Sequence, residues 1–346
     1  MLSWLKGNAS SPKVQQLWVF PIKASHRGTH SSCRGTRVDE SPYTEEGLEY
    51  DRQWMIVDAD SHKFLTARTL PKMVLIHPTI HRETGQLEIA VPSSDAPEKG
   101  QTYSVPLAHP TTYLANPDQD PSLDHDYVVW NSPAQDGYTV GSPELHAALS
   151  AFLGRNVLLI RKGLTKRTVA EVPGVVHSEH LDPVVGFADF YALLLASATS
   201  LAELNRRVPA TITTTTTVDE EDPISLGINR FRANVVVEGL SEPWEEDGWK
   251  QLRIGDEPIE VGFRCARCML PSVDPDTAIR HKQLPDAVMT DRVVQPLSAP
   301  KVCFGMLASP VKKQGGVLRV GDPVTVLESY PRPASGPYIR DEDRTN

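Results

Sequence analysis

The amino-terminal part of the chain carries short apolar or alternating segments that are separated by Pro, Gly, Asp and Asn. Segments of this kind are typical of short strands, and the separating residues are typical of turns. Because the chain also contains 29 prolines, a barrel or sandwich of many short strands is favoured over long helices. The pattern predicts strands within residues 13–23, 52–60, 73–81, 87–92 and 103–108.

A helix is predicted at about residues 142–153, where the apolar positions change to a helical spacing. Ser142 can cap its amino terminus, Pro143 suits its first position, and Gly154 can end it. The apolar segment 156–162 then predicts another strand, and we place a domain boundary near this helix.

A second helix is predicted to begin near Ser200, which has capping-box spacing to Glu203, and to end before Pro209. A threonine run followed by acidic residues comes next. It lacks the apolar alternation of a strand, so residues 210–222 are interpreted as an exposed insertion of low complexity.

Strand patterns resume after the insertion. Residues 234–240 form an apolar run, and the segments 251–263 and 317–328 each contain an Asp-bearing turn that is typical of a hairpin. The predicted fold class is a β-rich α+β protein with a few short helices. The predicted organisation is a polar tail (1–13), a β-barrel-like domain (14–140), a second β-rich domain (141–330) and a polar tail (331–346).

Composition and charge narrow the functional classes. The net charge of −9 argues against a protein that mainly binds nucleic acid, since that function needs a broad basic face. Four cysteines do not make a disulfide framework, and no apolar stretch approaches the roughly 20 residues of a membrane span. We therefore expect an intracellular protein whose thiols are free or bound to metal.

The segment FRCARCMLPSVDPDT, residues 263–277, holds two of the cysteines. A structural zinc site would need further ligands, for which only the single, remote Cys33 and Cys303 and the histidines His177 and His180 are available. A redox dithiol favours the start of a helix, whereas this pair follows a predicted strand and precedes prolines. Both interpretations are disfavoured, and neither is excluded.

Burial as small apolar residues is the simplest explanation for cysteines in general. It explains this pair less well, because Arg264 and Arg267 flank Cys265 and Cys268. Cationic neighbours favour the thiolate, and a thiolate is a soft metal ligand. The pair is therefore a candidate mount for a metal other than zinc.

The segment CARCMLPSVDPDTA, together with the later VGDPV, resembles the MOSC domain proteins, in the branch of the amidoxime-reducing molybdenum enzymes. The motif of that branch is close to C-S-R-C-I-L-T-T-V-D-P-D-T-G. The resemblance covers roughly residues 14 to 328 and implies a MOSC amino-terminal β-barrel domain followed by a MOSC domain. Further similar blocks are LWVFPIK, DRQWMIVDADSHKFLTAR, FADFYALLLASATSLAELNRRV and INRFRANVVVEG.

The resemblance implies that Cys268 is the protein ligand of molybdenum in a pterin (molybdopterin) cofactor. The pterin carries a phosphate, for which arginine and lysine are suitable partners. A carboxylate at Asp189 would accept N–H bonds from the pterin ring, and the backbone N–H of Ala266 could replace a serine contact of the family. The implied cofactor-binding positions are Lys23, Arg52, Asp189, Arg232, Ala266, Arg267 and Cys268.

The same resemblance implies a two-electron reduction of N-hydroxylated compounds, with electrons from cytochrome b5 and its NADH-dependent reductase. The alternative is a module that carries the molybdenum cofactor or sulfur without turnover, as in the MOSC domains of cofactor sulfurases, which follow a pyridoxal-phosphate domain. Relatives suggest a cytoplasmic or mitochondria-associated protein. Animal relatives carry an amino-terminal membrane anchor; because the predicted barrel starts near residue 14, we expect either a soluble chain or a true start that lies upstream.

Overall fold

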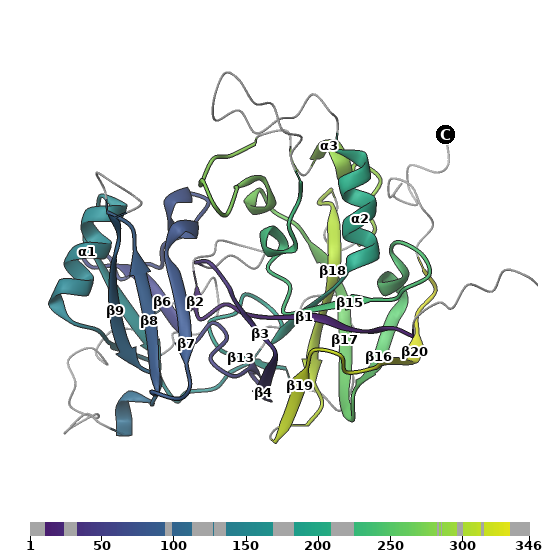
Figure 1. Cartoon of the computed structure of the whole chain (residues 1–346), viewed down its shortest axis with the longest axis horizontal. Helices are drawn as coiled ribbons and strands as arrows, with labels where there is room; N and C mark the ends of the chain where they lie inside the picture. Colours follow the sequence, from purple (N-terminus) through teal and green to yellow (C-terminus); the bar gives the residue numbers. More distant parts are fainter. Residues whose placement is uncertain are drawn as a thin grey trace, which may run out of the picture.

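The computed structural model describes residues 11–23, 33–93, 99–112, 127, 136–168, 183–208, 225–281, 284, 286–295, 300–312 and 315–332. Most of its regular structure is strand, so the predicted β-rich class is confirmed. One group of strands lies beside helix α1 and another beside helix α2, with β1, β3 and β4 between them (Figure 1). The predicted insertion 210–222 and nearly all of both predicted tails lie outside the described residues.

The largest sheet has eight strands in the order β20-β16-β17-β18-β14-β15-β1-β3. Its strand β1, the first of the chain, pairs antiparallel with β15, and Leu17 faces Val235. Strands from both ends of the sequence therefore share one sheet. Their bounds are Lys13–Val19 (β1), Thr36–Val38 (β3), Leu193–Ser197 (β14), Val235–Glu238 (β15), Trp249–Ile254 (β16), Glu257–Ala266 (β17), Cys303–Pro310 (β18) and Val324–Ser329 (β20).

Smaller sheets build the other half of the molecule. An antiparallel meander and a four-stranded sheet, in the order β10-β11-β6-β2, lie beside α1 (Figure 1). The strands are Ile22–Lys23 (β2), Trp54–Asp58 (β6), His77–His81 (β7), Gln86–Val91 (β8), Gln101–Pro106 (β9), Gly137–Thr139 (β10) and Val157–Lys162 (β11). Two further small sheets contain Glu40–Thr44 (β4), Gly47–Leu48 (β5) and Gly316–Arg319 (β19), and Arg167–Thr168 (β12) and Val184–Val185 (β13).

The first helix is placed as predicted. α1 spans Pro143–Leu153, the Ser142 hydroxyl accepts a hydrogen bond from the Leu145 amide at 3.3 Å, and Gly154 adopts a left-handed φ of 71°. Short helical segments elsewhere are Pro71–Leu75 (η1), Pro110–Thr112 (η3), Ile228–Phe231 (η6), Glu245–Gly248 (η7), Leu270–Ser272 (η8) and Asp286–Met289 (α3).

The second helix is present and begins two residues before Ser200, but the predicted capping role of Ser200 was wrong. α2 spans Ala198–Arg207, and its cap is Ser197, whose hydroxyl accepts from the amides of Thr199 and Ser200. Ser200 itself is buried inside the helix, and its hydroxyl donates to Glu246 at 2.8 Å. The serine that matched the capping-box spacing thus has a tertiary partner instead.

Two strand predictions also differ from the structure. The hairpin within 251–263 is confirmed by the pairing of β16 with β17, but β19 and β20 do not pair with each other. The turn at Gly321 sends β19 to β4 and β20 to β16, so the predicted hairpin within 317–328 was wrong. The segment 13–23 likewise divides into β1 and β2, which belong to different sheets.

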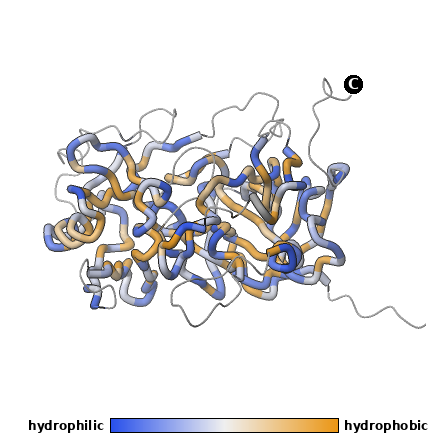
Figure 2. The backbone as a smooth tube through the Cα atoms, turned by 90° about the horizontal axis from the view of Figure 1, so that it is seen from above, coloured by the Kyte–Doolittle hydropathy of each residue, from blue (hydrophilic) through white to orange (hydrophobic). Residues whose placement is uncertain are grey.

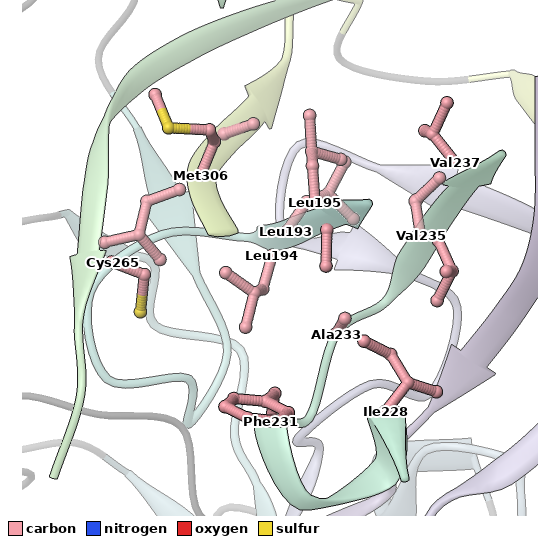
Figure 3. Packing of buried hydrophobic residues seen from close by; sticks show 14 of the residues in the cluster. Leu193, Leu194, Leu195, Ile228, Phe231, Ala233, Val235, Val237, Cys265 and Met306 are labelled. Atoms are coloured by element: carbon pink, nitrogen blue, oxygen red, sulfur yellow. The ribbon is translucent and has the colours of Figure 1, made fainter. Parts of the chain in front are cut away.

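Two main apolar cores are present, and most hydrophobic segments lie inside the molecule (Figure 2). The cysteine motif connects them. Cys265 packs in the core of the large sheet, where Figure 3 shows it together with Met306, Leu194 and Phe231. Leu270 and Val273, a few residues later, pack in the core formed by the amino-terminal strands and α1. The motif therefore lies where the two halves meet, although the domain boundary near residue 140 stays a prediction.

Candidate functional site

The two motif cysteines occupy different environments at the end of β17. Cys265 is the next-to-last residue of the strand and is buried, whereas Cys268 lies beyond the strand and is only partly buried. The Leu270 amide donates to the Cys268 sulfur at 3.2 Å. An N–H donor stabilises negative charge on sulfur. Cys268 is therefore the thiol of the pair that is open to a ligand.

Arg267 is directed toward Cys265 rather than Cys268. Its Nη1 donates to the Cys265 sulfur at 3.1 Å, and its Nη2 donates to the Phe231 carbonyl at 2.8 Å. Burial nevertheless raises the pKa of the Cys265 thiol, and the Arg267 cation only opposes this effect. Cys265 is thus a buried thiol that anchors the guanidinium.

Lys23 and Asp189 meet in the interior although they are far apart in the sequence. The Lys23 ammonium forms an ion pair with Oδ1 of Asp189, and both side chains are almost completely buried. Burial, reinforced by the cations of Arg167 and Arg52, lowers the pKa of Lys23 to about 8, while Asp189 opposes the shift. The structure thus brings these two predicted site residues into contact, while their binding of a cofactor stays a prediction.

Arg52 is buried next to them and is held by several partners. Its Nη1 contacts the carboxylate of Asp51 and donates to the Asn234 side chain at 3.1 Å, and its Nη2 donates to the Arg232 carbonyl at 3.3 Å. Its guanidinium carbon lies 4.6 Å from the Phe20 ring centre. Asp51 and Asn234 therefore fix this arginine from two sides.

Arg232 lies on the same aromatic ring. Its guanidinium carbon is 5.4 Å from the Phe20 ring centre, and its Nη1 donates to the Cys33 carbonyl at 2.8 Å. Burial, reinforced by nearby guanidinium groups, lowers the pKa of Arg232 from 12.5 to about 9. A cation whose charge is disfavoured by its surroundings needs an anion nearby.

These side chains form one buried cluster, which we call the cation cluster: Lys23, Arg52, Arg167, Arg232 and Arg267. Only two buried carboxylates, Asp51 and Asp189, contact it in the described part of the chain. The Nε atoms of Arg52, Arg232 and Arg267 are buried and find no hydrogen-bond partner among the described residues. Guanidinium groups with unused donors suit a phosphate or another polyanion.

The cation cluster and its hydrogen-bond partners include residues that sequence reasoning missed. Asp51 precedes Arg52 in DRQW, and Asn234 closes the segment RFRAN, so both stood inside similar blocks. Arg167 lay outside every block, and no pattern indicated it. Of the predicted site residues, Cys268 packs against the core of the amino-terminal strands and α1, and Ala266 packs in a small cluster with Val294 and Cys303.

The structure also bears on the rival interpretations of the cysteine pair. The pair lies at the end of β17 and is followed by the short 3-10 helix η8, so the Cys265–Cys268 segment does not begin an α-helix. Across the described ranges, no three His, Cys, Asp or Glu side chains gather as a metal site would require. His177 and His180, which were considered as zinc ligands, lie outside those ranges.

A separate cavity of about 330 Å³ lies near α2, and we call it the Trp244 pocket. The Arg292 guanidinium stacks 3.9 Å from the Trp244 ring centre and forms a buried ion pair with Asp247 at 2.6 Å. Arg207 pairs with Asp291 at 2.7 Å. The other residues that line the Trp244 pocket are Glu242, Pro243 and Arg332. Each arginine of this pocket has its own carboxylate, whereas Arg232 and Arg267 of the cation cluster contact none among the described residues.

Family models match both halves of the chain. The model described as MOSC N-terminal beta barrel domain matches residues 11–128, and the model described as MOSC domain matches residues 182–325. Both predicted domains are thus represented among known families. Within the described residues, no helix has both the length and the apolar character needed to cross a membrane.

Known proteins match over most of the chain. Mitochondrial amidoxime reducing component 2 of Rattus norvegicus is 30% identical over 324 residues, which cover 90% of this chain and 82% of that protein. Mitochondrial amidoxime-reducing component 1 of Homo sapiens is 26% identical and covers 91% and 82%. Molybdenum cofactor sulfurase of Danio rerio is 30% identical, but the match covers 80% of this chain and 30% of that protein.

Proposed function

Because this chain belongs to the MOSC domain family that includes the mitochondrial amidoxime reducing components, we propose that it is a molybdenum-cofactor oxidoreductase acting on N-hydroxylated compounds. The observation that carries the proposal is the cation cluster beside a half-open thiol. Buried cations that outnumber their carboxylates favour an anionic ligand. The sulfur of Cys268, at the edge of the cation cluster, favours a soft metal. A pterin phosphate that carries molybdenum satisfies both requirements.

In this proposal different residues would hold the metal, the phosphate and the pterin ring. Cys268 would bind molybdenum through its sulfur, assisted by the Leu270 amide. Arg52, Arg232 and Arg267 would hold the phosphate with the donors that the protein leaves unused. Lys23 and Asp189 would hold the pterin ring, and Ala266 would line the site between the cysteines.

When bound, the cofactor would supply the two-electron reduction that cleaves an N–O bond. The chain's own contribution is to hold it in a dry, fixed environment, because Lys23, Arg52 and Arg232 are each at most 2% exposed. Electrons would come from cytochrome b5 and its NADH-dependent reductase. Since the relatives are named mitochondrial, an association with mitochondria is part of this proposal.

The second candidate function is carriage of the cofactor or its sulfur without turnover. It is favoured by the match to molybdenum cofactor sulfurase, of which this chain resembles less than a third. A carrier would release its cofactor reversibly and would show no reductase activity. An enzyme would retain the cofactor and reduce an amidoxime when a donor chain is added.

The test is the molybdenum content of the purified protein and of Cys268→Ala, produced in a host that makes the pterin cofactor. We expect near-stoichiometric molybdenum in the parent and at least a tenfold loss in Cys268→Ala. Cys303→Ala is the matched control, because Cys303 is buried one strand away and should keep its molybdenum. Benzamidoxime reduction with cytochrome b5, its reductase and NADH then separates enzyme from carrier.

Two results would contradict the proposal in different ways. Zinc in place of molybdenum would remove the cofactor assignment altogether. Molybdenum that persists in Cys268→Ala would leave a cofactor protein but remove Cys268 as its ligand.

A further inference from the structure

The Asp189 carboxylate is carried by residues 186–189, the first part of the loop 186–192 between β13 and β14. This loop lies directly against the turn that carries Arg52, just before β6. The Phe187 amide donates to the Arg52 carbonyl at 2.8 Å. A side chain on Gly186 would place its Cβ 3.1 Å from the same carbonyl, so the close approach favours glycine. The amino-terminal half thus fixes one side of the loop.

Arg167 fixes the other side. It lies on β12 and pairs through its backbone with Val185, immediately before the loop. Its Nη1 donates to the carbonyls of Gly186, at 3.2 Å, and Ala188, and its Nη2 donates to the Asp189 carbonyl at 3.2 Å. One buried guanidinium therefore makes charge-assisted hydrogen bonds to three carbonyls within four consecutive residues of the loop.

We propose that Arg167 is a positioning residue for the cofactor: it holds the loop 186–189 so that the Asp189 carboxylate stays beside Lys23 and faces the pterin. The inference rests on the function proposed above and extends it to a residue that was given no contact with the metal or the phosphate there. Its planar fork can reach carbonyls that point in different directions. A lysine keeps the charge but not this geometry.

The arrangement explains why the cation is an arginine. The Arg167 charge lies close to Lys23 and Asp189. It adds to a buried site that already carries excess positive charge. A residue that only filled space would be apolar, because burying another cation here is unfavourable. The hydrogen bonds to the carbonyls offset the cost of burying Arg167, and they hold the loop that carries Asp189.

The experiment compares cofactor release from the loaded full-length parent, Arg167→Lys, Asp189→Asn and the double variant. Release is followed by the pterin and molybdenum that remain with the protein after timed gel filtration. We expect Arg167→Lys to release the pterin about ten- to a hundredfold faster, as is usual when a supporting residue is removed. In the Asp189→Asn background the same substitution should have little further effect, because its action passes through Asp189.

The matched control is Arg292→Lys, since Arg292 is also a buried arginine but lies in the Trp244 pocket. It should leave the release rate unchanged. A second measurement uses cofactor-free protein: amide hydrogen exchange of Phe187 should become faster in Arg167→Lys, while exchange in the β16–β17 hairpin should not.

The outcomes are separable. Additive effects of Arg167→Lys and Asp189→Asn on release would overturn the positioning role, as would unchanged release in Arg167→Lys. Faster release accompanied by general loss of stability would assign Arg167 to the fold alone. If the parent binds no molybdenum or pterin, the proposed function fails, and this inference fails with it.

Discussion

Two regions of the molecule gather arginines, and they do so in opposite ways. In the Trp244 pocket, Arg207 and Arg292 each pair with a carboxylate of the chain, at 2.7 and 2.6 Å. In the cation cluster, Arg232 donates to a carbonyl, and Arg267 donates to a carbonyl and a thiol. The first region balances its own charge. The second has five cations but only two buried carboxylates, Asp51 and Asp189, in contact with them among the described residues, and is therefore the region that needs a ligand.

Backbone strain does not make the same distinction. Arg52 and Arg232 adopt left-handed φ values of 50° and 58°, which is unusual for such residues and costs about 1–3 kcal/mol each. Trp244, in the balanced region, adopts a φ of 66°. Strained residues therefore occur in both regions. Charge balance, rather than strain, separates a candidate ligand site from a structural network.

The largest expected effect is on stability, in the balanced region. Arg292→Met should lower the free energy of unfolding by about 3–5 kcal/mol, because it leaves the Asp247 carboxylate buried without its cation. Both side chains are at most 5% exposed, so water cannot replace the lost partner. Urea unfolding followed by circular dichroism measures the change.

The control for this prediction lies in the same pocket. Arg207→Met breaks the ion pair with Asp291. Because the Arg207 and Asp291 side chains are 25% and 35% exposed, the free energy of unfolding should fall by no more than about 1 kcal/mol. Equal losses in both variants would show that burial of the Arg292–Asp247 pair is not what matters.

A smaller effect is expected from Glu246, which is buried next to Asp247. Burial, reinforced by the Asp247 charge, raises the pKa of Glu246 from 4.5 to about 7, while the Ser200 hydroxyl opposes the shift. A carboxyl with a raised folded-state pKa contributes its full stability below pH 4.5. That contribution, at most about 3 kcal/mol, is lost as the pH rises through about 7.

Glu246→Gln should therefore flatten the pH dependence of stability between about pH 4.5 and 7. Its free energy of unfolding should exceed that of the parent at pH 8, where the parent carboxylate is charged. Urea titrations at several pH values make the comparison. An unchanged slope would assign the pH dependence to other groups.

The fold was predictable where local rules and tertiary packing agree. Ser142, Pro143 and Gly154 bound α1 as expected, because all three act within the helix itself. Ser200 misled because its hydroxyl bonds Glu246 across the molecule, which no local spacing reveals. The β19–β20 turn misled for the same reason: the turn forms, but its strands find better partners in two sheets.

The site was predictable through resemblance more than through spacing. The family resemblance is confirmed, and the structure places Lys23 against Asp189 and Arg52 beside Arg232. Binding of the cofactor by these residues stays a prediction. Arg167 could not be foreseen, because a single arginine in a polar segment carries no sequence signal until the loop it holds is known.

The smallest expected effect on stability concerns Arg232→Met in cofactor-free protein. Removing a cation that lacks a carboxylate partner relieves a buried charge, and this gain offsets the lost hydrogen bond to the Cys33 carbonyl. The free energy of unfolding should change by less than about 1 kcal/mol, in contrast to the Arg292→Met loss. Urea unfolding of both variants under one condition tests the contrast.

Inorganic phosphate sharpens this last comparison, because it offers the missing anion. At ten times its dissociation constant it should stabilise the cofactor-free parent by about 1.4 kcal/mol. Sodium chloride at equal ionic strength should have a smaller effect, and Arg292→Lys should respond like the parent. Arg232→Met should lose most of the response. If phosphate stabilises the parent and Arg232→Met equally, the anion binds elsewhere, and the charge excess of the cation cluster no longer identifies a ligand site.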